Sequence, residues 1–215
     1  MAIARTGTSS GNNSASSLTI SHTNSAGADQ FLAVSGLITG ATTVTGITHN
    51  GVSMTSLYNA DFAEGPLYVA TFVLKNPAVG TYNVVMTRSS SGNNFFNCVS
   101  WSDVDQTTPY YNNGHVGSTT STTQTVNLTA TSADDWFYLY SGGQRDSTAN
   151  TNVTRVVNGN QSDSFDSNGT VGSTSARDYK IDVASSGSTY NYLQYFLLKK
   201  AGAAATFIPK IVMID

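Results

Sequence analysis

The sequence predicts an all-β fold, an antiparallel β-sandwich, and three observations lead to that prediction. Charged residues make up only 11% of the 215 residues, and Ser, Thr, Asn and Gly take their place. Glu64 is the only glutamate, so the chain lacks the residues that cover the wet face of long helices. Short alternating runs separated by turn residues recur along the whole chain, which is typical of β-strands.

In the first half, the clearest signal is Asn50-Gly51, a dipeptide that accepts the positive φ angles of a tight hairpin turn. Residues 66–74 are apolar on both faces of the expected strand, so we expect that strand to lie between two layers. The expected strands of this half are 17–21, 30–38, 44–49, 52–58, 66–74, 81–87 and 95–104.

The second half is more polar, and residues 136–140 form its best candidate for a core anchor because they are almost all aromatic. The expected strands here are 123–128, 136–140, 153–157, 177–183 and 190–198, while most of 141–172 reads as loop. We find no internal repeat and no second domain. The sequence predicts one sandwich domain over residues 1–200, followed by a linker and tail over 201–215.

The charge and hydropathy of the chain limit the classes of partner that we expect. A formal charge of −3 argues against nucleic acid, which requires clustered Lys and Arg. No apolar run reaches the length of a membrane span, so we expect no membrane insertion. No apolar segment of a secretory signal follows Met1, which favours assembly in a cytoplasm. The single cysteine, Cys98, lies in a strand-like run and reads as a small buried hydrophobe.

The best candidate for a metal site is the polar stretch that contains Asp163, Asp166 and Asn168. Its spacing does not match a calcium-binding loop, and the same residue types are common in turns, so a solvated turn is the favoured reading. Asp103 and Asp105 alternate on one strand face, and we expect them to cap a strand end before Pro109. We therefore predict no metal ion.

Catalytic groups do not gather in any recognisable motif. His22, His49 and His115 are scattered over different loops and strand ends, and none lies in a nucleophile motif. A glycosidase pair would need Glu64 together with an aspartate such as Asp105, in an arrangement that the sequence does not show. The sequence predicts no enzyme, no catalytic residue and no cofactor.

Tyrosine offers a different kind of site, because aromatic faces beside amides are typical of sugar-binding sites. Of the eleven tyrosines, Tyr110 and Tyr111 follow Pro109 in an expected loop and are the best candidates for exposed glycan contacts. The alternative is that they are ordinary strand residues with their hydroxyls near water.

The end of the chain changes character after the small residues 201–206. An apolar segment there would promote aggregation if it stayed free. It either folds back as a last strand of its own domain or docks on a neighbouring subunit by strand addition. The residues expected to carry assembly are Phe207, Ile208, Ile211, Val212, Met213 and Ile214.

One stretch of the chain resembles a known group, and it is the run Val99-Ser-Trp101-Ser-Asp103-Val104-Asp105-Gln106-Thr107-Thr108-Pro109. It resembles the strand-and-turn signature of a β-sandwich family that is common in bacteriophage virion proteins and in prokaryotic surface proteins. The likeness covers roughly residues 15–200. Where the family usually has Gly before Val-Asp-Gln, this chain has Asp103. The resemblance implies a jelly-roll-like sandwich with a role in presentation or adhesion, and no shared catalytic residue.

These observations lead to three hypotheses about function. The first is a structural protein of a bacteriophage virion, such as a head decoration, head-fibre or tail-associated subunit, that assembles in the host cytoplasm as a homo-oligomer with other virion proteins. The second is a carbohydrate-binding or adhesin domain that contacts a host-surface glycan. The third, a hydrolase, lacks any motif with a mechanism.

Overall fold

The computed structural model describes residues 1–40, 43–61, 67–118, 123–143, 147–159, 162–183 and 191–202. These ranges contain antiparallel strands and no helix, which confirms the predicted all-β sandwich. Accordingly, none of the ranges holds a helix that could span a membrane. Glu64 and the predicted assembly residues Phe207, Ile208, Ile211, Val212, Met213 and Ile214 lie outside the described residues.

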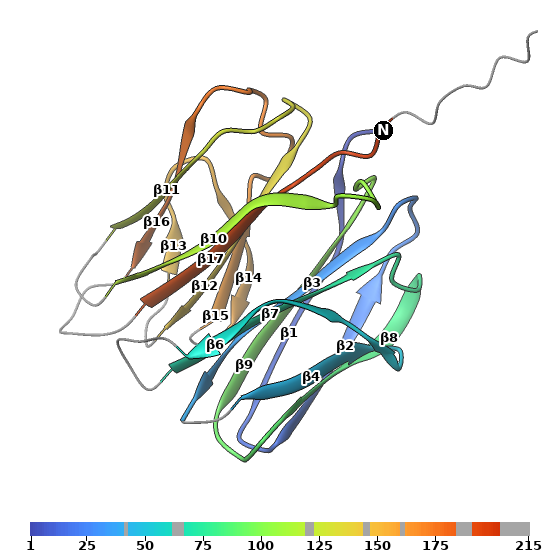
Figure 1. Cartoon of the computed structure of the whole chain (residues 1–215), viewed down its shortest axis with the longest axis vertical. Helices are drawn as coiled ribbons and strands as arrows, with labels where there is room; N and C mark the ends of the chain where they lie inside the picture. Colours follow the sequence, from blue (N-terminus) through green and yellow to red (C-terminus); the bar gives the residue numbers. More distant parts are fainter. Residues whose placement is uncertain are drawn as a thin grey trace, which may run out of the picture.

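The N-terminal half is a sandwich of two sheets (Figure 1). The inner N-sheet has the order β1 (Ala4–Asn13), β9 (Asn94–Ser102), β3 (Phe31–Thr39), β7 (Leu67–Lys75), β6 (Thr55–Asp61). The outer N-sheet has the order β2 (Ser17–Asn24), β8 (Gly80–Arg88), β4 (Val44–His49), β5 (Val52–Ser53). Asn50 and Gly51, with φ angles of 50° and 76°, form the predicted tight turn between β4 and β5.

The C-terminal half is a second sandwich. The inner C-sheet has the order β10 (Tyr110–Ser118), β17 (Asn191–Leu198), β12 (Trp136–Gly143), β15 (Ser162–Asp166), β14 (Thr154–Gly159). The outer C-sheet has the order β11 (Thr123–Leu128), β16 (Arg177–Val183), β13 (Ser147–Ala149). The two inner sheets face each other, so the molecule is a stack of four sheets (Figure 1).

Each gap between neighbouring sheets holds its own core. One cluster joins the two N-sheets, one joins the two C-sheets, and a central cluster joins the inner sheets of both halves. Burial follows this layering: β2 alternates buried and exposed residues because one of its faces meets solvent, whereas β3 is buried along almost its whole length. Trp136 and its neighbours in β12 are buried, which confirms the predicted core anchor.

The central core also contains buried hydroxyl groups, and they are hydrogen-bonded to one another. The Tyr138 hydroxyl lies 3.2 Å from the Ser35 hydroxyl and 3.2 Å from that of Ser164. Thr71 donates a hydrogen bond of 2.8 Å to Ser35, and the Asn97 amide donates one of 3.1 Å to Ser164. The Tyr138–Ser35 and Asn97–Ser164 bonds cross between the halves, and all four bonds satisfy polar groups that would otherwise be costly to bury.

The two halves have the same strand order, a repeat that the sequence reading missed. In the inner N-sheet, β1 pairs with β9, β9 with β3, and β3 with β7. In the inner C-sheet, β10 pairs with β17, β17 with β12, and β12 with β15 in the same way. This is the jelly-roll order, with two sheets and Greek-key connections. Even a β-bulge recurs: register shifts between Ser56 and Tyr58 in β6, and between Arg155 and Val157 in β14.

Sequence similarity between the halves survives mainly before their third strands, where Ala28-Asp29 precedes β3 and Ala133-Asp134 precedes β12. Elsewhere the side chains have diverged. The strand β7 is nine residues long and mainly apolar, whereas its counterpart β15 reads Ser-Asp-Ser-Phe-Asp. The repeat was therefore missed because topology is shared while composition is not. The single-domain boundary over 1–200 stays a prediction.

A second correction concerns residues 141–172, which the sequence reading assigned mostly to loop. Besides β14, which the expected strand 153–157 anticipates, this region contributes β13 and β15, and Asp163 and Asp166 lie on β15 with their side chains buried. They are not part of a solvated turn. The misreading arose because buried Ser and Asp look like turn residues when their partners, far away in sequence, are unknown.

Candidate functional site

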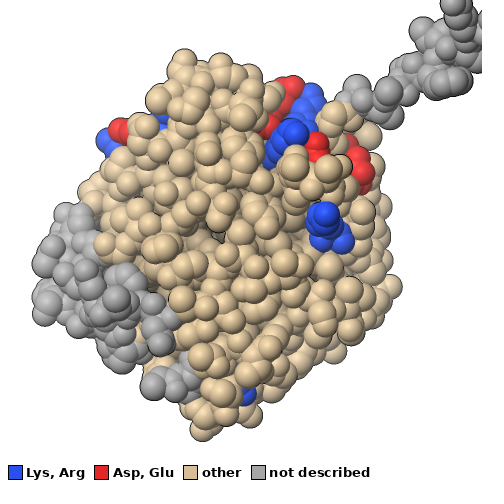
Figure 2. Space-filling view, viewed as in Figure 1, with Lys and Arg blue, Asp and Glu red and all other residues tan. Residues whose placement is uncertain are grey.

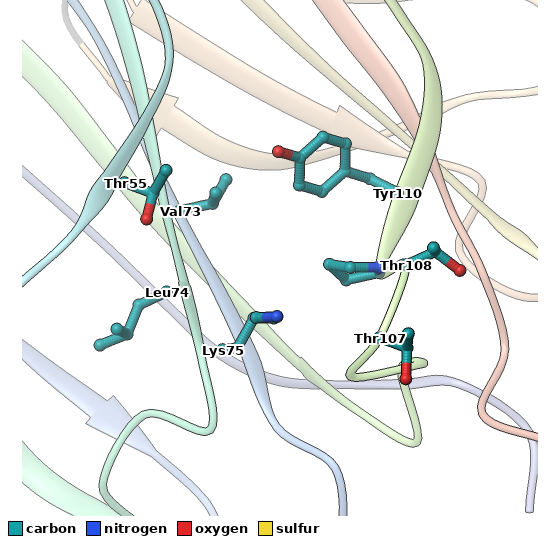
Figure 3. Close-up of a pocket in the computed structure, with 8 residues that line it drawn as sticks. Thr55, Val73, Leu74, Lys75, Thr107, Thr108 and Tyr110 are labelled. Atoms are coloured by element: carbon teal, nitrogen blue, oxygen red, sulfur yellow. The ribbon is translucent and has the colours of Figure 1, made fainter.

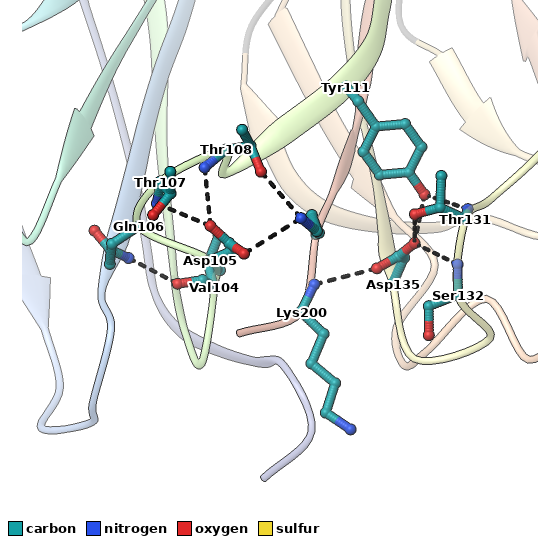
Figure 4. Close-up of polar contacts among 11 residues, drawn as sticks. Val104, Asp105, Gln106, Thr107, Thr108, Tyr111, Thr131, Ser132, Asp135 and Lys200 are labelled. Carbon is teal, nitrogen blue, oxygen red and sulfur yellow. Dashed lines mark hydrogen bonds and ion pairs between the residues drawn. The ribbon is translucent and has the colours of Figure 1, made fainter. Parts of the chain in front are cut away.

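The run Val104 to Pro109 forms a rigid turn that links the two halves, between β9 and β10. The Asp105 carboxylate accepts hydrogen bonds of 2.8 Å from the backbone N–H groups of both Thr107 and Thr108 (Figure 4). The bond from Thr108, with smaller contributions from Thr107 and Lys199, holds the pKa of Asp105 below its usual range. Asp105 therefore caps the turn, as the sequence predicts.

Asp103, directly before this turn, adopts a positive φ of 60°. That left-handed conformation is the one that glycine accepts most easily and that Asp tolerates better than most residues. Asp103 thus takes a glycine-like backbone conformation at the position where the resembling family has Gly. Gln106 ties the turn to the N-terminal half, since its side-chain amide donates to the carbonyl oxygens of Gln30 (3.1 Å) and Val104 (2.8 Å).

A buried carboxylate, Asp135, organises the neighbouring part of the C-terminal half. It accepts hydrogen bonds from the Tyr111 hydroxyl, the Thr131 hydroxyl (3.0 Å), the Ser132 N–H (2.8 Å) and the Lys200 N–H (3.1 Å) (Figure 4). Burial raises the pKa of Tyr111 to about 12, and the bond to Asp135 acts in the same direction. Tyr111 is therefore a structural residue whose hydroxyl is already engaged.

Tyr110 and Tyr111 begin strand β10 and are half-buried, so the prediction that they stand exposed in a loop is wrong. Tyr111 packs against the core between the two C-sheets. The ring of Tyr110 contacts Phe31 and Phe196, with ring centroids 6.0 and 5.9 Å apart. Strand pairing of β10 with β17 draws both tyrosines toward the cores.

Tyr110 also lines a groove of about 560 Å³ between the two halves, which we call the junction groove. Its ring points toward Thr55 and Val73 across the hollow (Figure 3). Lys75 lines the same groove and donates a hydrogen bond of 3.0 Å to the Gln106 carbonyl. The lining residues are Thr55, Val73, Leu74, Lys75, Thr107, Thr108, Pro109 and Tyr110. The lining is thus apolar with hydroxyl groups and one cation, and includes no carboxylate or amide side chain.

Charge is concentrated near this end of the molecule. On the face shown in Figure 2, most of the surface carries neutral residues, and most of the charged side chains gather at one edge. Lys199 pairs with Asp105 (3.4 Å), and Lys200 pairs with Asp134 (2.5 Å), just after β17. The remaining neutral surface matches the low charged fraction of the sequence.

The structure brings together two histidines that the sequence reading left scattered. His22 and His49 are both buried between the N-sheets, with ring centroids 6.4 Å apart. The ring nitrogens of His22 lie within hydrogen-bond distance of the hydroxyls of Ser9 (2.9 Å) and Ser100 (3.1 Å). Burial, helped by His49, lowers the pKa of His22 to about 4. A catalytic triad needs a carboxylate on the histidine, and here both partners are serines.

His115 lies apart from this pair and stacks on Tyr192 at the junction of the two halves, with centroids 5.8 Å apart. Cys98 is fully buried, as predicted, and burial raises the pKa of its thiol to about 12.

The aspartates of the candidate metal stretch have protein partners. Asp163 accepts a hydrogen bond of 2.8 Å from the Ser147 N–H, and Asp166 forms an ion pair of 2.8 Å with Arg5. Across the described ranges, no three His, Cys, Asp or Glu side chains are grouped so that they could hold a metal ion. Asp163 and Asp166 therefore bond to groups of the chain itself.

No protein-family model matches the chain, and no curated protein matches it significantly. The geometry of the junction groove and the fold therefore carry the functional argument. Sequence reasoning found Tyr110 and the turn that precedes it, but missed Thr55, Val73 and Lys75. These three residues lie on strands β6 and β7, far from Tyr110 in sequence, and only the strand order brings them to one groove.

Proposed function

We propose that the chain is a structural subunit of a bacteriophage virion, such as a head decoration, head-fibre or tail-associated protein, that acts by assembly and surface presentation. One observation carries this proposal: the described molecule is a stack of four sheets with a mostly apolar groove at the junction of its halves. An apolar hollow can hold apolar side chains of a partner at the core of an interface, whereas catalysis needs positioned ionisable groups.

Two further features support a structural role. Three of the described ionisable groups with buried side chains have structural partners: Asp135 anchors a loop, Asp166 pairs with Arg5, and His22 contacts two serines. The turn that contains Asp105 carries the residues on which the resemblance rests, and the Asp105 carboxylate bonds two of its backbone N–H groups.

A direct experiment tests this function in particles. Virions of the phage that encodes the chain would be purified on a density gradient and analysed by mass spectrometry and by labelling with an antibody against the chain. We expect the chain to co-purify with intact particles at a fixed number of copies. Its recovery only from the soluble fraction, or only from the surface of uninfected cells, would overturn the proposal.

A carbohydrate-binding or adhesin role is the second candidate, because Tyr110 presents part of its ring to the junction groove. The hydroxyls of Thr55, Thr107 and Thr108 could bond a sugar, but the groove offers no amide or carboxylate for paired hydrogen bonds. A glycan array probed with the full chain, with and without calcium, tests this role. Binding that is lost in Tyr110→Ala supports it, and signals at background remove it.

A further inference from the structure

The two halves meet reciprocally, which creates two equivalent junctions. At one junction, Tyr58 of β6 packs against His115 of β10, with centroids 4.9 Å apart, and against Tyr192 of β17. At the other, β14 and β15 of the C-terminal half face β1 and β9, and Arg5 bonds Asp166. Each half therefore presents its inner-sheet edge to the first strand of the other half.

Strand register identifies which residues correspond at the two junctions. In the inner N-sheet Arg5 pairs with Trp101, and in the inner C-sheet Tyr110 pairs with Leu198. Arg5 and Tyr110 therefore occupy corresponding positions of the two sheets. By the same register, Asp166 of β15 corresponds to Val73 of β7. One junction is thus closed by the Arg5–Asp166 ion pair, whereas its counterpart has Tyr110 and Val73 and leaves the junction groove open.

An open apolar hollow, at the position where the other junction has an ion pair, favours a missing apolar partner. The chain itself contains such a partner in residues 207–214, its densest apolar segment beyond the described residues. Asp215 follows that segment, and Lys75 in the groove supplies a complementary charge. The apolar side chains of the segment therefore match the apolar lining of the groove, and Asp215 matches Lys75.

We propose that the junction groove receives the apolar C-terminal segment, residues 207–214, of a second copy of this chain. The proposal rests on the assembly function above and names its contact site. Side chains such as Ile211 would pack against Val73, Pro109 and Tyr110. Strand addition or insertion of a terminal segment into a neighbour is a known way to build assemblies from identical subunits.

The position of the end of β17 favours a neighbouring copy over the chain's own groove. Strand β10 is an edge strand, with β17 on its paired side. Beyond β17, Lys199 donates to the Pro109 carbonyl (2.9 Å) and Ala201 donates to that of Asp103 (2.8 Å), so the chain is held beside the turn. Residues 107–110 stand between this strand end and the groove (Figure 3).

Disulfide cross-linking between two differently tagged full-length chains tests the proposal. One chain carries Thr55→Cys, an exposed residue of the groove, and the other carries Ile211→Cys. Cys98 stays silent because it is fully buried. We expect mild oxidation of the mixture to give a cross-linked pair containing both tags. Thr19→Cys, on the exposed face of the outer N-sheet, is the matched control and should give at least tenfold less product.

The other outcomes are equally informative. A chain with both Thr55→Cys and Ile211→Cys that forms only an internally linked monomer would show that each segment occupies its own groove, which overturns the second-copy assignment. Absence of any cross-link overturns the groove assignment. If the wild-type chain is nevertheless oligomeric in the same buffer, the assembly function survives while the contact site proposed here does not.

Discussion

Arg5 of β1 and Asp166 of β15 join the two sandwiches through an ion pair of 2.8 Å between Nη1 and Oδ2. The Asp166 side chain is completely buried, whereas that of Arg5 is 29% exposed. Burial raises the pKa of Asp166, and the Arg5 guanidinium opposes that shift. The two halves meet at two equivalent junctions. The ion pair lies at one of them, at the position that corresponds to the junction groove at the other.

The first prediction concerns this ion pair. Arg5→Met leaves a buried carboxylate without its cation, and we expect a loss of about 3 kcal/mol in the free energy of unfolding at pH 7. The loss should be smaller at pH 4, because a raised pKa lets Asp166 become protonated in the folded state and a neutral acid needs no cation. Urea unfolding at both pH values measures this. Equal losses at pH 4 and pH 7 would contradict the explanation.

The second prediction separates the two neighbouring tyrosines. Tyr111→Phe removes the hydroxyl that bonds Asp135 and accepts the Thr131 N–H (2.8 Å), so we expect a loss of about 1–3 kcal/mol. Tyr110→Phe is the matched control and should change stability by less than about 0.5 kcal/mol, because no hydrogen bond of its hydroxyl is present in the described structure. Thermal and urea unfolding compare the two. A larger loss for Tyr110→Phe would show that their roles are reversed.

The third prediction is a pH dependence that arises from His22. Its folded pKa of about 4 lies below the usual 6.5, so the unfolded chain binds the proton more tightly. Stability is therefore fully present above pH 6.5 and falls as the pH drops toward about 4, by about 3 kcal/mol in all. The pKa of His49 is also lowered and acts in the same direction. We expect His22→Gln to flatten this profile in urea unfolding at pH 7, 5.5 and 4. An unchanged slope in the variant would exclude His22 as the cause.

Much of the fold could be predicted from the sequence because strand periodicity and turn residues are local signals. The Asn50-Gly51 hairpin and the buried run of β3 are examples. Strands β1 and β15 were missed because Gly, Ser, Asn and Asp dominate them, and these residues favour turns when considered alone. Their pairing with β9 and β12 is a long-range property that overrides local preference.

The site was less predictable. The motif around Asp105 and the aromatic residue Tyr110 could be found because they are adjacent in sequence. The junction groove depends on Thr55 and Val73, which reach Tyr110 only after two sandwiches have formed and docked. Likewise, His22 and His49 meet through the pairing of β2 and β4 with β8. Such contacts are set by the topology, which no local pattern encodes.

The groove itself offers a fourth prediction. Thr55→Asp places a carboxylate in the junction groove at an exposed position, so it should leave folding intact. We expect it to weaken association of the full chain at least tenfold, because a desolvated charge would face an apolar segment. Ser56→Asp, the exposed neighbour that does not line the groove, is the control. Sedimentation velocity of both variants compares them, and equal weakening would contradict a specific role for the groove.

Light scattering on the full-length chain over a range of concentrations tests the central claim of assembly most directly. We expect a defined oligomer of the wild-type chain that shifts to monomer when Ile211→Asp disrupts the apolar segment. A wild-type chain that remains a monomer at every concentration would contradict it.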